Sequence, residues 1–141
     1  MLKLDTANQI ISFALGYGLR NNLDPLTAVV LDSRGCAKAV QSQDGSSLFR
    51  FQIAFGKAYG AIGLGIGSRA IFERAQQQPF FVEAVNTAAD GALIPVPGGV
   101  LIKDADGNLL GSVGVTGDIS DKDEAAAVAG IEAVGFNAAT G

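Results

Sequence analysis

Residues 97–124, PGGVLIKDADGNLLGSVGVTGDISDKDE, decide the fold of this chain. Two apolar runs, GVLIKD and LLGSVGVT, flank an Asp106-Gly107 turn, and this pattern predicts an antiparallel hairpin. The second run, residues 109–116, has the composition of a strand buried on both faces. We therefore expect the chain to be built on an antiparallel sheet.

The same stretch also predicts a site. Gly98 and Gly99 allow backbone to approach a ligand closely, and Gly117 ends the second strand. Ser120 is expected to cap a last helix, whose unpaired N–H groups could hold an anion. The alternative is structural: a carboxylate three or four residues further on reaches back to the cap, as in a capping box. The sequence leaves both interpretations open.

The rest of the chain supplies helices and a second hairpin. Apolar spacing predicts a first helix that Asp5 or Thr6 caps. The runs LTAVVLD and CAKAV predict two strands joined by a tight turn. We then expect helices over residues 48–64, 68–77 and 79–88 and a strand at ALIPV, residues 92–96. Tight turns between strands favour an antiparallel sheet. The prediction is a single α+β domain, residues 1–141, with a central antiparallel sheet of about five strands flanked by helices in a profilin-like layered architecture.

Composition excludes several classes of function. The net charge is -4 and the sequence pI is near 4.6, and no basic stripe is present, so we expect no nucleic-acid partner. No segment has the length and hydropathy of a membrane span, and the N-terminus lacks a leader pattern, so a cytoplasmic location is expected. A mean hydropathy of +0.31 favours burial in a dimer or higher homo-oligomer.

The chain has no histidine. This excludes Ser-His-Asp and Cys-His nucleophiles, histidine-based zinc sites and the usual proximal ligand of haem. We predict no metal site. Lys57 lies in the apolar helical segment IAFGKAYGA, where it either snorkels to solvent or serves a pocket as a cation or base. Cys36 is either a small buried hydrophobe or a thiolate ligand.

The run Gly63-Leu64-Gly65-Ile66-Gly67 invites a dinucleotide-binding interpretation. That fingerprint requires a preceding strand, whereas a helix is expected here. We interpret the run as a helix C-cap followed by a loop.

The chain resembles the haem-degrading or GlcG-like family, which includes HbpS-like proteins and the C-terminal domain of PduO-type proteins. Three segments carry the resemblance: PLTAVVLDSRGCAKAVQSQDGS, IAFGKAYGAIGLG and the stretch from residue 97 to residue 131. In the last of these, Pro-Gly-Gly, a Gly-Val-Thr-Gly run and an acidic opening of an Ala-rich helix stand in the family's order. The resemblance implies helices on an antiparallel sheet, a homo-oligomer and a small pocket.

The resemblance also implies the site residues. Those expected to bind a ligand or cofactor are Asp44, Gly98, Gly99, Thr116 and Gly117, and those expected to do chemistry are Lys57, Asp123 and Glu124. Haem is the cofactor that the family implies. The family's histidine and methionine positions hold other residues here, which disfavours conventional haem ligation. The remaining candidate ligands are Cys36, Lys57, Tyr17, Tyr59 and Thr116.

Two functions follow as expectations. The first is a protein that binds a tetrapyrrole or a small carboxylate ligand in the glycine-rich pocket of a homo-oligomer. The second is an enzyme that performs proton transfer, isomerisation or lyase chemistry on a small organic substrate, with Lys57 and either Glu124 or Asp123 as acid and base.

Overall fold

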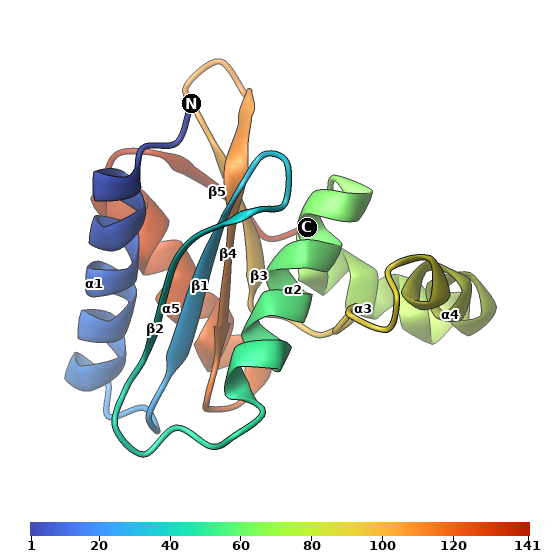
Figure 1. Cartoon of the computed structure of the whole chain (residues 1–141), viewed down its shortest axis with the longest axis horizontal. Helices are drawn as coiled ribbons and strands as arrows, with labels where there is room; N and C mark the ends of the chain where they lie inside the picture. Colours follow the sequence, from blue (N-terminus) through green and yellow to red (C-terminus); the bar gives the residue numbers. More distant parts are fainter.

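The computed structural model describes all 141 residues as five helices and five strands (Figure 1). The helices are α1 (Leu4–Arg20), α2 (Arg50–Leu64), α3 (Ser68–Gln77), α4 (Pro79–Ala88) and α5 (Ser120–Ala133). The strands are β1 (Thr27–Asp32), β2 (Ala37–Ser42), β3 (Gly99–Lys103), β4 (Leu109–Thr116) and β5 (Asn137–Ala139).

All five strands form one antiparallel sheet in the order β2-β1-β4-β3-β5. The two predicted hairpins, β1-β2 and β3-β4, are both present, and β1 pairs with β4 at the centre of the sheet. β4 is buried along most of its length, as its apolar run predicts. The predicted α+β architecture is confirmed.

Helices cover the two faces of the sheet unequally. Figure 1 shows α1 and α5 together on one face and α2 on the other, with α3 and α4 extending away from the sheet as an arm. The main core lies between α1, α5 and the sheet, and it includes Ile10, Val30, Val113 and Ile131. A smaller core lies between α2 and the sheet, and a third between α3, α4 and the end of α2. α2 packs on β1, β4 and β3, which leaves β2 without a helix on that face.

Three local predictions were wrong. Residues 92–96 form no strand, because Pro95 and Pro97 remove N–H donors that a ladder needs. The first helix starts at Leu4 after Lys3, with no side-chain cap. The last helix has Ile119 at its N-cap position and Ser120 as its first residue, and no side chain caps it. By contrast, Gly65 ends α2 in the left-handed conformation, as the C-cap interpretation predicts.

No helix of the chain combines the length and the hydropathy that a membrane span requires. The short strand β5, residues 137–139, was not predicted, because NAA has neither β-branched nor aromatic residues. Its position is set by pairing with β3.

Candidate functional site

A buried ion pair lies at the predicted corner. Lys57, on α2, donates from Nζ to Asp123 Oδ2 at 3.1 Å and to the Val115 carbonyl oxygen at 3.0 Å. Asp123 also accepts the backbone N–H of Asp118 through Oδ1 at 2.9 Å. The exposed fractions of the two side chains are 2% for Lys57 and 1% for Asp123. The pair therefore joins α2, β4 and the first turn of α5.

Burial acts on the charges of both partners. It lowers the pKa of Lys57 and raises the pKa of Asp123, because each charged form has lost its hydration, and the opposite charge of the partner works against both shifts. The contacts of both side chains lie within the chain. Lys57 thus lies in the interior, unlike the snorkelling lysine that was one of the two expectations.

Gly98 and Gly99 close over this pair. A Cβ atom at Gly98, whose φ is 123°, would lie 2.8 Å from Lys57 Nζ and 2.6 Å from the Val115 carbonyl oxygen. A Cβ atom at Gly99 would collide with the Lys57 carbonyl oxygen. The Gly99 N–H donates to Ser68 Oγ at 2.7 Å. Both glycines lie closely against Lys57, and the expected approach to a ligand stays a prediction.

Glu124 faces a different cation. Arg69 Nε donates to both Glu124 carboxylate oxygens, at 3.0 and 3.2 Å, and its Nη2 donates to Asp121 Oδ1 at 2.6 Å. These bonds, that to Glu124 first, raise the pKa of Arg69. A cavity of about 300 Å³ opens beside this cluster, lined by Arg69, Phe72, Val96, Pro97, Ile119, Ser120 and Asp121. We call it the corner cavity.

Thr116 and Gly117 lie at the end of β4, next to the buried pair. Thr116 is buried and accepts a hydrogen bond from Arg50 Nη1 at 2.8 Å through Oγ1. Gly117 has a φ of 151°, and a Cβ there would collide with the Pro25 carbonyl oxygen. Sequence reasoning missed Arg50; the signal available was a cation three residues after Ser47, at the start of a helix.

Asp44 is separate from these residues. It lies in an open groove of about 490 Å³ between α1 and β2, with Leu15, Leu19, Leu23, Pro25, Gln41, Ser42 and Gln43. Neither an ion pair nor a side-chain hydrogen bond links Asp44 to the corner. The structure therefore gathers seven of the eight predicted residues around the corner. Asp44 follows β2 at the same end of the sheet, but it lines a different hollow.

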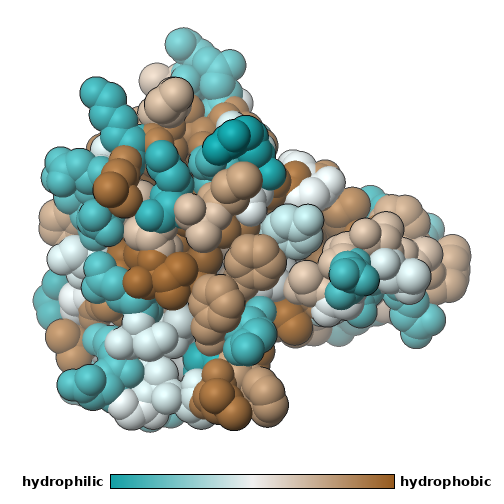
Figure 2. Space-filling model, in the orientation of Figure 1, coloured by the Kyte–Doolittle hydropathy of each residue, from teal (hydrophilic) through white to brown (hydrophobic).

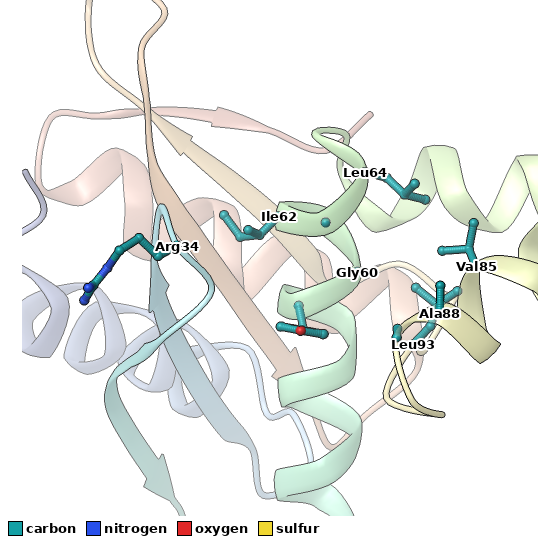
Figure 3. A pocket seen from close by; sticks show the side chains of 10 residues that line it. Arg34, Gly60, Ile62, Leu64, Val85, Ala88 and Leu93 are labelled. Carbon is teal, nitrogen blue, oxygen red and sulfur yellow. The ribbon is translucent and has the colours of Figure 1, made fainter.

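A third hollow crosses α2. This α2 groove has a volume of about 300 Å³ and is lined by Arg34, Tyr59, Gly60, Ile62, Gly63, Leu64, Val85, Ala88, Ala89 and Leu93. Figure 3 shows the turn carrying Arg34 on one side of α2 and Val85, Ala88 and Leu93 on the other. Its lining is mainly apolar. Sequence reasoning missed it, because it forms only when α4 and the β1-β2 turn pack beside α2.

Glycines form the floor of the α2 groove. A Cβ atom at Gly63 would meet no heavy atom within 4 Å, so the helix surface there is open. Tyr59 stacks on Phe55 with ring centroids 5.1 Å apart, and its ring edge lies against Gly35 of the β1-β2 turn. Arg34 points away from the groove in Figure 3 and pairs with Asp32 at 3.0 Å, and its side chain is 78% exposed.

The candidate haem ligands are distributed unequally. Lys57 and Thr116 are buried and hydrogen-bonded within the chain. Tyr17 lies on α1, packed against the main core. Tyr59 lines the α2 groove, and Cys36 is exposed at the end of the neighbouring turn. No cluster of three or more potential metal-ligating carboxylate, thiol or imidazole side chains is present.

Comparison with known proteins confirms the resemblance. The family model described as haem degrading protein HbpS-like matches residues 2–132. The structure is similar to that of PduOC in complex with haem, with a TM-score of 0.85 and 19% identity over 96% of each chain. It is also similar to HbpS, with a TM-score of 0.81 and 23% identity over 95% of this chain and 90% of that one. Klebsiella pneumoniae protein ORFY gives a TM-score of 0.82 at 21% identity over 93% and 88%. A search of the curated proteins gives no match.

Proposed function

Because the chain belongs to the HbpS-like family of haem-degrading proteins, we propose that it binds a tetrapyrrole in the α2 groove. One observation carries the proposal: a mainly apolar hollow crosses α2 beside Gly63, where an added Cβ atom would meet no heavy atom within 4 Å, whereas Leu93 packs over Gly60. A flat apolar ring can lie against such a surface and bury its face. A volume of about 300 Å³ is at the lower end of the range for small-molecule sites, so part of the ring would stay exposed.

The polar ends of a tetrapyrrole have partners beside the groove. The Arg34 guanidinium is exposed and points away from the groove toward Asp32, so it would have to leave Asp32 and turn toward the groove to bind the ligand's carboxylates. Haem, when bound, would supply a redox-active iron. Tyr59 would present a phenol oxygen, a known though less usual haem ligand. A structurally similar protein, PduOC, has a crystal structure with haem, which supports this ligand class.

A titration with two ligands tests this proposal. We expect haem to give a shifted Soret band that saturates at one equivalent, and metal-free protoporphyrin IX to quench its fluorescence on binding. The Tyr59→Phe variant keeps the ring and its packing but loses the oxygen, so it should still bind protoporphyrin while the haem spectrum changes. Failure of wild-type protein to bind either ligand at micromolar concentration would refute the proposal.

The corner cavity supports a second candidate, the binding or acid-base turnover of a small carboxylate. Arg69, the only cation lining this cavity, offers donors, and Glu124 lies beside it. In this proposal Glu124 moves the proton. Lys57, Asp123, Thr116, Gly98, Gly99 and Gly117 do not line the cavity, and they serve it by holding in place the segments that do. A rise in melting temperature with millimolar oxalate or malonate that is lost in Arg69→Met would support it. The absence of any such rise would exclude it.

Self-association into a dimer or higher homo-oligomer is also part of the proposal. Large apolar side chains are exposed on several elements, with exposed fractions above 40%: Leu4, Phe13, Leu19, Val40, Leu48, Phe49, Phe51, Phe80 and Ile119. Figure 2 shows such surface over the region between β2 and α2 and along the arm.

We also propose a cytoplasmic location, which cell fractionation would test.

A further inference from the structure

We propose that β2 is the self-association strand, pairing antiparallel with β2 of a second copy so that one sheet runs through both. This inference rests on the proposed self-association and assigns it to a surface. The two edges of the sheet differ: β5 has three residues, whereas β2 has six. A long free edge with unpaired N–H and C=O groups is a template for another strand.

The hydrogen-bond pattern shows which backbone groups of β2 are free. The Gln43 N–H donates to the Leu26 carbonyl oxygen at 2.9 Å, in register with the pairs Ser42 to Thr27 and Gln41 to Ala28. Since hydrogen-bonded and non-hydrogen-bonded pairs alternate in an antiparallel ladder, Gln41 and Ala39 also bond inward to β1. The backbone groups of Val40 and Ser42 therefore point outward, toward a neighbouring strand.

The side chains beside this edge lack cover. α2 packs on β1, β4 and β3 and leaves β2 bare, so that Val40 is 41% exposed. Phe51, at the start of α2, is 43% exposed. Figure 2 shows apolar surface in this region, between β2 and α2. A second copy at the edge would cover Val40 on this face.

The charged residues at the two ends of β2 favour a second copy of this chain as the partner, and they favour one pairing register between the two β2 strands. Lys38, at one end of β2, and Asp44, just beyond the other end, have no ion pair within the chain. Two-fold antiparallel pairing centred on Gln41 brings Lys38 of each copy opposite Asp44 of the other, and it pairs the outward groups of Val40 with those of Ser42. Lys38 is the extra residue of the bulge in the β1-β2 ladder, where Ala39 pairs with Val30 and Ala37 with Leu31, and Asp44 lies in the turn after β2. The two charges therefore flank the ladder formed by Val40, Gln41 and Ser42.

The first test blocks the edge. Wild-type protein in analytical ultracentrifugation should sediment with at least twice the monomer mass of 14.4 kDa. Val40→Pro removes an outward N–H while the inward bonds of Ala39 and Gln41 remain, so it should weaken association about tenfold or more and leave the far-UV circular dichroism spectrum unchanged. Phe80→Ser, on the arm, is the matched control and should leave the mass unchanged.

The second test needs no proline. Lys38→Glu and Asp44→Lys each place like charges opposite one another and should each weaken association, whereas the double variant restores opposite charges and should recover it. An oligomer that survives Val40→Pro with its fold intact, or a double variant no better than the singles, would overturn the β2 assignment while leaving self-association itself standing. A wild-type monomer at tens of micromolar would overturn both.

Discussion

Lys57 and Asp123 are the two charged side chains that the fold encloses completely. Their removal from water costs free energy, and the attraction between them together with the bonds from Lys57 to Val115 and from Asp118 to Asp123 offsets that cost. The pair fixes where α5 begins relative to α2, and Gly98 leaves room for the lysine. The ion pair therefore acts as a structural link between α2, β4 and α5.

This role predicts a specific mutational pattern. Lys57→Met leaves the Asp123 carboxylate buried without its partner and should lower the free energy of unfolding by about 3–5 kcal/mol. The double variant Lys57→Met, Asp123→Leu removes both charges and should recover most of that loss. Urea unfolding of the two single variants and the double variant measures the coupling. Additive losses would show that the two side chains do not interact.

A second carboxylate predicts a dependence on pH. Asp118 accepts the backbone N–H groups of Asp24 and Ile119 at 2.8 Å each, and these bonds, that from Asp24 first, hold its pKa below the usual 3.8. Because the pKa is lower in the folded chain than in the unfolded one, the stabilisation is complete above the unfolded value and is lost as pH falls through the folded value.

We expect Asp118 to titrate below the usual aspartate range when its carboxyl carbon is followed by NMR. In Asp118→Asn, the acid limb of a stability-versus-pH curve should be flatter than in wild-type protein. A carboxyl pKa at or above 3.8 would contradict the assigned hydrogen bonds.

At the scale of elements, α2 shows how glycines can serve two purposes in one helix. At Gly56 an added Cβ would collide with the Ala92 carbonyl oxygen and crowd Ile94, so this glycine permits close packing. At Gly63 the same atom would meet nothing, so this glycine opens the groove. The sequence alone does not distinguish the two, because the difference comes from segments far along the chain.

The two glycines should respond oppositely to alanine. Gly63→Ala should raise the free energy of unfolding by up to about 1 kcal/mol, because alanine has the higher helix propensity and no clash results. Gly56→Ala should lower it, because the collision with backbone outweighs the gain in propensity. Thermal and urea unfolding of the two variants give the signs, and two shifts of the same sign would contradict the packing described for α2.

The same scale shows what the sequence could and could not predict. Both hairpins, all five helices within a few residues, and the Gly65 C-cap followed from periodicity and turn chemistry. The cap of α5 was not predicted correctly. One carboxylate oxygen of Asp123 accepts a hydrogen bond from Lys57 and the other accepts one from the Asp118 N–H, and Ile119 occupies the N-cap position. Arg50 was missed as well, since its partner Thr116 lies more than 50 residues away in the chain.

At the scale of the whole molecule, the two faces of the sheet differ in what they carry. The face with α1 and α5 holds the main core, whereas the face with α2 carries the groove, part of the exposed apolar surface and the side of β2 that no helix covers. The arm of α3 and α4 extends beyond the sheet and supplies the second wall of the groove (Figure 1). Ligand binding and self-association are thus both proposed on the face that a single helix covers.

Binding of protoporphyrin IX to a groove-filling variant tests the central claim most directly. Gly63→Phe places a ring in the open space above α2, and Gly16→Phe places the same ring on α1, where an added Cβ meets only the flexible end of Arg20. In fluorescence titrations of folded protein, we predict that wild type and Gly16→Phe bind with the same affinity and that Gly63→Phe binds at least about tenfold more weakly. Equal affinity in all three would contradict the α2 groove as the ligand site.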